Sequence, residues 1–305
     1  MYGVPGEMTE NISRSSESLW QSNSACLDAS QSYGAESTAL DLKVVGRGYL
    51  GTLISRALSV SPPVSLSSKT PVEGYNQTVV IASGPSSVSV TETELQSWRE
   101  HLRHWLGAHR HQLATSKIIY LSSAGTVYGE TGREEVDENC ALNPKNHYGN
   151  YHCWAENELR NFCGDEVTIL RLSNLYGPNQ LNKKGQGLVT ACIRSVREND
   201  YLPIFGDGSL IRDYLLEDDL VLILKMLLDR PTAGTFNVAS GIPYSIIEVI
   251  REVERLVNQS IKIKELPKRP EDIECIRLSN RKLLRALNIN TLTNLRDGIK
   301  AYGYS

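Results

Sequence analysis

The chain has 305 residues, of which 40% are hydrophobic and 22% are charged, and its formal net charge at pH 7 is −3. This composition predicts one or two globular domains with a large core and excludes a disordered or collagen-like chain. The mixed charge gives no basic face for nucleic acid. The longest apolar run, residues 220–228, is interrupted by Lys225 and is far shorter than the roughly 20 residues of a membrane span, so no membrane segment is expected.

Residues 1–41 are Ser-rich and lack hydrophobic periodicity, which predicts a flexible extension of no legible role. The six cysteines are scattered without a CxxC pair, and no secretory hydrophobic region precedes them. This usage is typical of reduced thiols and predicts a cytoplasmic location.

The chain becomes regular at residue 42. A strand-like segment, residues 42–45, leads into a GxGxxG spacing and then into a helical run through Leu58. In this context the pattern favours dinucleotide binding: the glycines allow a tight turn and a close approach of the backbone to a pyrophosphate, which the helix N-terminus would face. The alternative is that the glycines serve only to form a turn. The predicted cofactor contacts are Gly46, Arg47, Gly48, Tyr49, Leu50 and Gly51, together with Gly84 further along the chain.

Further strands are predicted at 64–67, 78–82, 117–122 and 167–172, with helices at 92–114 and 148–162 between them. This alternation indicates an α/β fold with a doubly wound parallel sheet of the Rossmann type, whose ligand crevice lies at the carboxyl ends of the strands. Only about a dozen residues separate the second strand from Thr78, so we expect the sheet to be abbreviated after that strand.

A basic residue occupies the place where an acid often holds the ribose of NAD. The second strand ends in Ser67, Ser68 and Lys69, about twenty residues past the glycines. A Lys with two hydroxyls suits a 2′-phosphate, so Ser68 and Lys69 favour NADP over NAD. The alternative is that Lys69 is a solvated loop residue.

Two central segments carry a family pattern, LSSAGTVYG at 121–129 and HYGNYHCWAE at 147–156. They resemble the extended short-chain dehydrogenase/reductase family of nucleotide-sugar epimerases, dehydratases and 4-ketoreductases, whose members carry SS(S/T)xxVYG and YGxSKxxxE. The resemblance implies Tyr148 as the proton-transfer residue and a contact of the bound nicotinamide. The family Lys, which bonds the nicotinamide ribose, is replaced by His152, which is predicted as a cofactor contact and a partial stand-in. The family hydroxyl position is Ala124.

Three neighbouring hydroxyls could replace the one missing at Ala124. They belong to Ser122, Ser123 and Thr126, and the sequence does not show which of them points inward. We predict Tyr148, His152, Ser123 and Thr126 as the catalytic set. Reduction of a keto sugar needs Tyr148 only as an acid, so it is less impaired by these losses than alcohol oxidation.

The second half matches the same family in four ordered segments: RLSNLYGP at 171–178, LPIFGDGSLIRDY at 202–214, TFNVASG at 235–241 and KRPED at 268–272. The resemblance implies that Arg212 and Arg269 bind the diphosphate of a nucleotide sugar, with a salt bridge as the alternative for each. Phe205 is a candidate to stack on the base, or else a packed loop aromatic. The predicted substrate contacts are Asn174, Leu188, Phe205, Arg212, Arg269 and Asp272.

The domain prediction is a dinucleotide-binding domain at 42–175 and a smaller α/β nucleotide-sugar-binding domain at 176–305, with strand 235–239 returning to the main sheet. The four histidines at 101, 104, 109 and 111 are interpreted as a solvated helix face, and no metal is predicted. Trp105 and Trp154 are candidates for a homodimer interface, with core packing as an equal alternative.

The functional prediction is NAD(P)-dependent modification of a nucleotide diphosphate sugar by an altered epimerase, dehydratase or 4-ketoreductase site. The alternative is a catalytically inactive relative that binds a nucleotide sugar or regulates a paralogous partner.

Overall fold

A computed structural model describes residues 41–67, 76–132, 134–181, 187–270 and 272–303. Apart from Asp41, the predicted extension lies outside these residues, as do Ser68 and Lys69. Residues 41–305 form one compact unit. Among the described residues, no helix combines the length and the apolar character that crossing a bilayer requires.

The main sheet is parallel and has five strands in the order β1-β2-β3-β5-β9. Their bounds are β1 Leu42–Val45, β2 Thr78–Ile81, β3 Lys117–Ser123, β5 Thr168–Leu172 and β9 Gly234–Val238. The first four lie within segments expected as strands of this sheet, and β9, which pairs with β5, overlaps the segment 235–239 predicted to return to it. The α/β fold class with a parallel doubly wound sheet is therefore confirmed.

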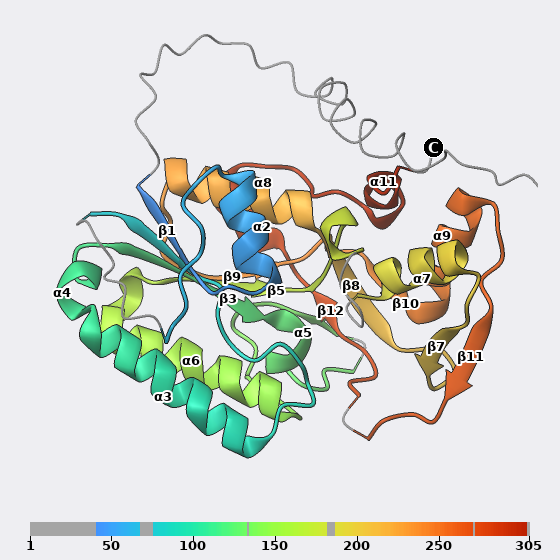
Figure 1. Ribbon diagram of the computed structural model, residues 1–305, viewed down its shortest axis with the longest axis horizontal. Helices are drawn as coiled ribbons and strands as arrows, with labels where there is room; N and C mark the ends of the chain where they lie inside the picture. The colour runs from blue at the N-terminus through green and yellow to red at the C-terminus, as the bar shows by residue number, and fades with distance from the viewer. Residues whose placement is uncertain (1–40, 68–75, 133, 182–186, 271, 304–305) are drawn as a thin grey trace, which may run out of the picture. The chain divides into compact units, whose positions relative to one another are not determined.

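Helices cover both faces of this sheet (Figure 1). One face carries α2 (Tyr49–Ala57), α8 (Glu217–Asp229) and α10 (Arg281–Leu287), and the other carries α3 (Glu92–Ala108) and α6 (His147–Cys163). Successive strand residues point to opposite faces. Val80 accordingly belongs to the first core, whereas Val79 and Ile81 belong to the second.

The edge beside β1 is where the expectation for a second strand was wrong. Segment 64–67 contributes only one parallel bridge, Val64 to Val45, with Gly46 N–H donating to the Val64 carbonyl at 2.7 Å. Pro62 and Pro63 lack backbone donors, and the Ser65 hydroxyl accepts from the Ser67 N–H at 3.3 Å, so side-chain bonding replaces further ladder bonds. Residues 65–67 and 76–77, the described part of the connection to β2, add no strand.

The predicted helix 92–114 is divided in two. A capping box at Thr91 and Glu94 begins α3, which ends at Ala108, and α4 (Arg110–Leu113) follows. The His109 ring bonds the Trp105 carbonyl at 2.8 Å and so satisfies a carbonyl of the last turn at the break. Trp105 is 1% exposed within the core, so the core interpretation holds for it.

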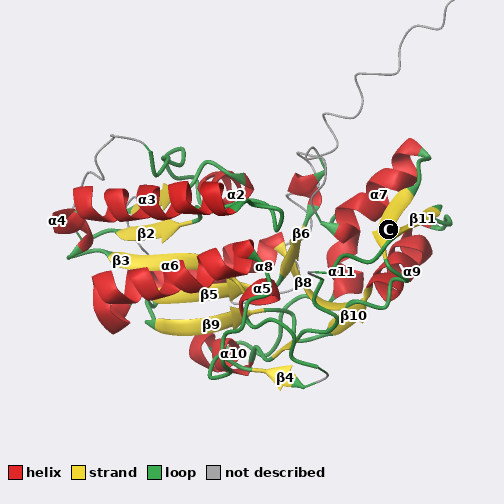
Figure 2. Ribbon diagram, turned by 90° about the horizontal axis from the view of Figure 1, so that it is seen from below, coloured by secondary structure: helices red, strands yellow, loops and turns green. Residues whose placement is uncertain are grey.

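Smaller sheets form the C-terminal part, which lies beyond the carboxyl end of β5 (Figure 2). Strands β10 (Pro243–Ser245), β8 (Ile211–Leu216) and β6 (Asn174–Tyr176) form one sheet in that order. Two further pairs are β7 (Leu202–Phe205) with β11 (Ile263–Leu266), and β4 (Glu135–Val136) with β12 (Arg277–Leu278). The helices of this part are α7 (Leu188–Glu198), α9 (Ile246–Val257) and α11 (Leu295–Lys300).

The strand order reverses at β1, since Val64 lies on one side of it and β2 on the other. In open α/β sheets ligands bind at such a switch point, outside the carboxyl ends of the strands. The residues that follow β1 and β3 are therefore the first place to look for a site.

Candidate functional site

The three glycines after β1 have three different environments. A Cβ on Gly46 would lie 2.2 Å from the Ala82 carbonyl oxygen, and one on Gly51 would lie 1.7 Å from the Gly46 oxygen. A Cβ on Gly48 would have no described atom within 4 Å. Two glycines thus permit close packing, while the third leaves open space above the backbone. This is the division of roles in a dinucleotide-binding turn.

The first turn of α2 is open to an anion. Its N-cap is Gly48, and within the described residues it has neither a side-chain cap bond nor an acid in the first turn. A pyrophosphate could accept from N–H groups at such a helix start. The turn and this helix end therefore fit the phosphates of a nicotinamide dinucleotide.

The glycine turn is tied to the other half of the chain through Tyr49. Its hydroxyl donates to Glu217, a fully buried carboxylate at the start of α8. The other oxygen of Glu217 accepts from the backbone and side-chain nitrogens of Asn179 at 3.0 and 2.7 Å. Burial and Glu217 raise the pKa of Tyr49, so the phenol stays protonated. The sequence signalled neither Glu217 nor Asn179 as a partner of this turn.

The other residues predicted at the cofactor surround this turn. The Arg47 Nε donates to the Pro63 carbonyl at 3.4 Å, and Leu50 packs against the core beneath α2. Gly84 follows β2, where a Cβ would lie 2.8 Å from the ring of Tyr151. Gly84 thus lets the exit of β2 approach α6.

Tyr148 and Ser123 meet at the carboxyl end of β3. Ser123 is the last residue of that strand, and Tyr148 lies in the first turn of α6, whose N-cap Asn146 accepts from the Gly149 N–H at 2.8 Å. The Ser123 side chain lies near enough to the Tyr148 phenol to lower its pKa, while burial raises that pKa. Burial is the larger effect, so the pKa of Tyr148 is raised overall.

The structure distinguishes the three candidate hydroxyls. Thr126, in α5 (Ala124–Val127), donates to the Ser123 hydroxyl at 3.0 Å and so helps to fix the orientation of that hydroxyl. Ser122 faces the opposite way and donates to Glu156 at 2.6 Å. Ala124 is buried in a hydrophobic cluster. The hydroxyl beside Tyr148 is therefore that of Ser123, the preceding residue.

His152 lies one turn beyond Tyr148, with ring centroids 4.6 Å apart in an edge-on contact. Its Nδ1 is 2.8 Å from the hydroxyl of Tyr120, and its Nε2 is buried without a partner among the described residues. Burial lowers the pKa of His152 to about 4, against a smaller opposing effect of Glu156. His152 is therefore neutral near pH 7 and provides no cation beside Tyr148.

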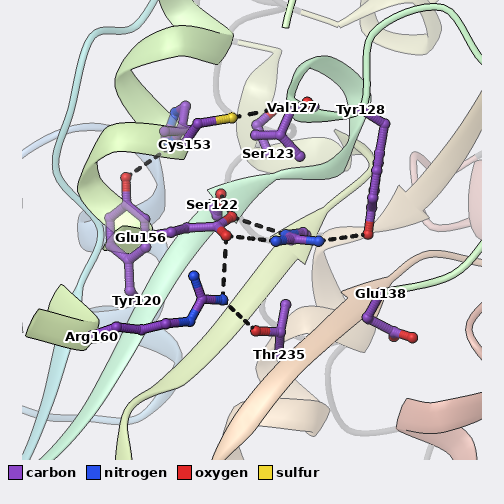
Figure 3. A network of polar contacts seen from close by, with 12 residues as sticks. Tyr120, Ser122, Ser123, Val127, Tyr128, Glu138, Cys153, Glu156, Arg160 and Thr235 are labelled. Carbon is purple, nitrogen blue, oxygen red and sulfur yellow. Dashed lines mark hydrogen bonds and ion pairs between the residues drawn. The ribbon is translucent and has the colours of Figure 1, made fainter. Parts of the chain in front are cut away.

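A polar network lies in the core beneath this pair (Figure 3). The Arg171 guanidinium donates from Nε and Nη2 to Glu156 at 2.9 and 2.7 Å, and from Nη1 to the Tyr128 hydroxyl at 2.9 Å. Tyr128 donates onward to Asn237 at 2.6 Å. Burial opposes the charge of Arg171, but Glu156 outweighs it and raises the arginine pKa. The network joins β3, α6, β5 and β9 in one arrangement.

Arg269 and Asp272 lie at the centre of a second group of predicted site residues, the substrate contacts. The Arg269 guanidinium donates to both carboxylate oxygens of Asp272 at 3.3 and 3.1 Å, and it lies 4.1 Å from the ring centroid of Phe205. Arg212, on β8, donates to the Ile211 carbonyl at 2.8 Å. Burial lowers the pKa of Arg212, while Asp272 is among the groups that oppose this. Both arginines are therefore within electrostatic reach of one carboxylate.

A solvent-open cavity of roughly 450 Å³ adjoins Arg269 and Asp272. Its wall also contains charged side chains of both signs, namely Glu130, Lys145, Lys268 and Glu274. The remaining two predicted substrate contacts, Asn174 and Leu188, lie on β6 and α7, which pack against each other. A Cβ on Gly125 would lie 3.6 Å from the Asn174 amide oxygen, which places Asn174 beside α5, and Leu188 begins α7 and packs on its core.

Comparison with known proteins gives the family. The sequence profile of the NAD dependent epimerase/dehydratase family matches residues 84–239, just over half of the chain. The chain belongs to this family. The matched span contains Tyr148, His152, Asn174 and Arg212, while the glycine turn and Arg269 lie outside it.

Curated relatives cover part of the chain. A putative UDP-glucose 4-epimerase from Methanocaldococcus jannaschii is 29% identical over 188 residues, 60% of this chain and 61% of that protein. The dTDP-D-glucose 4,6-dehydratase of Homo sapiens is 26% identical over 167 residues, 53% and 47% of the two chains. The chain thus spans about half to three fifths of the length of such relatives.

Solved structures share the fold over most of the chain. The UDP-glucose 4-epimerase of Thermotoga maritima with UDP-glucose superposes with a TM-score of 0.73 at 20% identity, covering 86% of this chain and 96% of that one. A UDP-glucuronic acid 4-epimerase from Bacillus cereus, in complex with a fluorinated UDP-sugar and NAD, gives 0.74 at 20% identity, covering 86% and 98%. These likenesses support the Rossmann-type fold assignment.

Proposed function

We propose that the protein is an NAD(P)-dependent enzyme that modifies a nucleotide diphosphate sugar, and that its site works best as a 4-ketoreductase. The observation that carries this proposal is the Tyr148–Ser123 hydroxyl pair at the carboxyl end of β3. After β1, which β2 separates from β3, an uncapped helix end and an open glycine turn provide a place for the cofactor phosphates. When bound, the nicotinamide supplies the hydride chemistry.

The direction of reaction follows from protonation. Tyr148 has a raised pKa and a neutral imidazole beside it, so its phenol is held in the acid form. A phenol can give its proton to the carbonyl oxygen on which negative charge develops during reduction, so that the product is an alcohol; the phenolate then takes a proton from solvent. Alcohol oxidation would instead need the phenolate, which a neighbouring cation would have favoured. Ser123 holds the same oxygen through its hydroxyl.

The nucleotide sugar would bind at the group of residues around Arg269 and Asp272. Arg212 and Arg269 would bind the diphosphate, and in doing so Arg269 would exchange part of its bond to Asp272 for phosphate oxygens. Asn174 and Leu188 would border the sugar, while Phe205 would stack on the base. The relatives' names include UDP- and dTDP-sugars, which supports this ligand class without choosing within it.

Three finer features complete the proposal. Ser67, Ser68 and Lys69 support NADP over NAD. A homodimer, or assembly with a paralogous partner, through the face of α3 and α6 that contains Trp154 stays a prediction from the family resemblance. The five described cysteines are free thiols, which supports the cytoplasm.

The test uses the purified full-length chain with NADPH or NADH and UDP- or dTDP-linked 4-keto sugars. We expect saturable NADPH fluorescence and turnover that is lost in Tyr148→Phe and reduced in Ser123→Ala, with Tyr151→Phe as the matched control. Absence of any nicotinamide binding would overturn the proposal. A second candidate, a catalytically silent binding partner, is favoured by Ala124 and the neutral His152; it predicts that UDP-sugars bind without turnover.

A further inference from the structure

His152 and Tyr120 form a buried pair that the proposed reaction does not yet use. Tyr120 lies on β3 and is fully buried, and its hydroxyl oxygen is 2.8 Å from His152 Nδ1. The imidazole is enclosed by three tyrosine rings, Tyr148, Tyr151 and Tyr120, with centroids at 4.6, 5.6 and 5.9 Å. This shell fixes the ring plane and leaves the hydrogen bond to decide where the proton resides.

The direction of that hydrogen bond can be derived by counting buried polar groups. A neutral imidazole has one N–H donor and one acceptor nitrogen, and a phenol has one O–H donor. If Tyr120 donates to Nδ1, then only the Nε2–H lacks a partner among the described residues. If Nδ1–H donates to Tyr120, the phenol O–H and the Nε2 lone pair are both left unpaired. The first arrangement leaves fewer buried groups unsatisfied and is favoured.

Neighbouring charges do not reverse this choice. The charged group nearest along α6 is Glu156, and both its oxygens are engaged by Arg171 and Ser122. The Tyr120 phenol is itself buried, which raises its pKa and keeps its proton available to donate. The pair is therefore an uncharged donor–acceptor unit.

We propose that Tyr120 is a positioning residue that holds His152 as the Nε2–H tautomer, and that this N–H donates to an oxygen of the ligand bound beside Tyr148. The proposal rests on the proposed function for the ligand, but not for the tautomer. His152 is 5% exposed, and its unpaired Nε2 is a donor for which the described protein provides no acceptor. A hydroxyl of a bound ribose or of the hexose has the required chemistry.

The first measurement is made without ligand. Full-length protein labelled with ¹⁵N at its six histidines is analysed through two-bond ¹H–¹⁵N couplings, and His152→Gln identifies the signal of His152. We expect an Nε2–H pattern in the wild type, a mixture of tautomers in Tyr120→Phe, and the wild-type pattern in Tyr151→Phe. Tyr151 is the matched control because its ring contacts the same imidazole while its hydroxyl has no described partner. A wild-type Nδ1–H pattern would overturn the proposal even if Tyr120→Phe did not fold, because the assignment needs only His152→Gln.

The second measurement adds NADPH alone, UDP-glucose alone, or both. A shift of the Nε2 signal with NADPH alone identifies the ribose as the acceptor, and a shift only with the UDP-sugar identifies the hexose. We expect Tyr120→Phe to weaken binding of that ligand by about 3- to 10-fold, with Tyr151→Phe within about twofold of wild type. Equal binding by both variants refutes the positioning role and leaves the enzyme proposal intact. Failure of every variant and the wild type to bind NADPH refutes the enzyme proposal instead.

Discussion

The buried pair of Glu156 and Arg171 offers a test of how the core beneath the site is held together. Glu156 is fully buried and Arg171 is 3% exposed, with two N–O distances of 2.9 and 2.7 Å between them. Glu156→Gln keeps the shape but leaves the guanidinium uncompensated. Breaking a buried pair on one side costs about 3–5 kcal/mol of unfolding free energy.

The expected effect is large enough for thermal denaturation. For a chain of this size each kcal/mol lowers the Tm by about 2–4 °C, so Glu156→Gln should lower it by about 6–20 °C. Arg171→Met should also lower the Tm, because it leaves the buried carboxylate with only Ser122 and a longer ion pair to Arg160 at 3.6 Å. The double variant has no uncompensated charge, so its loss should be well below the sum of the two single losses.

A surface pair provides the matched control. Arg103 donates to both oxygens of Glu158 at 3.0 and 3.1 Å, but its side chain is 60% exposed. Glu158→Gln should therefore leave the Tm within about 2 °C of the wild type. If Glu156→Gln shifts the midpoint no more than Glu158→Gln does, or if the two core substitutions are additive, the reasoning about this network is wrong.

Three other predictions follow from the site. Gly51→Ala, whose Cβ would lie 1.7 Å from the Gly46 oxygen, should sharply lower the Tm, whereas Gly48→Ala should fold normally and weaken NADPH binding in a fluorescence titration. His152 has a folded pKa of about 4 against 6.5 unfolded, so stability is fully present above pH 6.5 and falls by about 3 kcal/mol as the pH drops to 4. Chemical unfolding at pH 5 and pH 8 should show about 2 kcal/mol of this loss in the wild type but not in His152→Gln. Ser123→Ala should lower kcat by about 10-fold or more in a turnover assay, and an unchanged kcat would remove Ser123 from the site.

The sequence predicted the sheet well because its strands are buried on both faces. Runs such as Ile118–Leu121 are apolar at every position, and glycine or polar residues end each run. The error at 64–67 has a local cause, since a Ser hydroxyl and two prolines compete with ladder bonds that the apolar pattern alone suggests.

The site was harder to predict than the fold because it depends on where side chains point at the ends of strands and helices. At the end of β3 the strand, whose side chains alternate between faces, gives way to a helical turn. Only the structure shows that Ser123 lies beside Tyr148 while Ser122 donates to Glu156. Partners of Tyr120 and Glu217 are distant in sequence and follow no fixed spacing. The positions of Tyr148 and His152 on one helix face, in contrast, follow from their separation of four residues.

The bare start of α2 has a consequence for local order. Helices α3 and α9 each begin with a capping box that the chain itself supplies, whereas α2 begins at Gly48 without one in the described structure. Amide protons of Leu50 and Gly51 should therefore exchange with deuterium quickly in the free protein and slowly once a phosphate occupies the turn. Such a change would be confined to this turn, so the rate of deuterium uptake there reports occupancy without any assay of turnover.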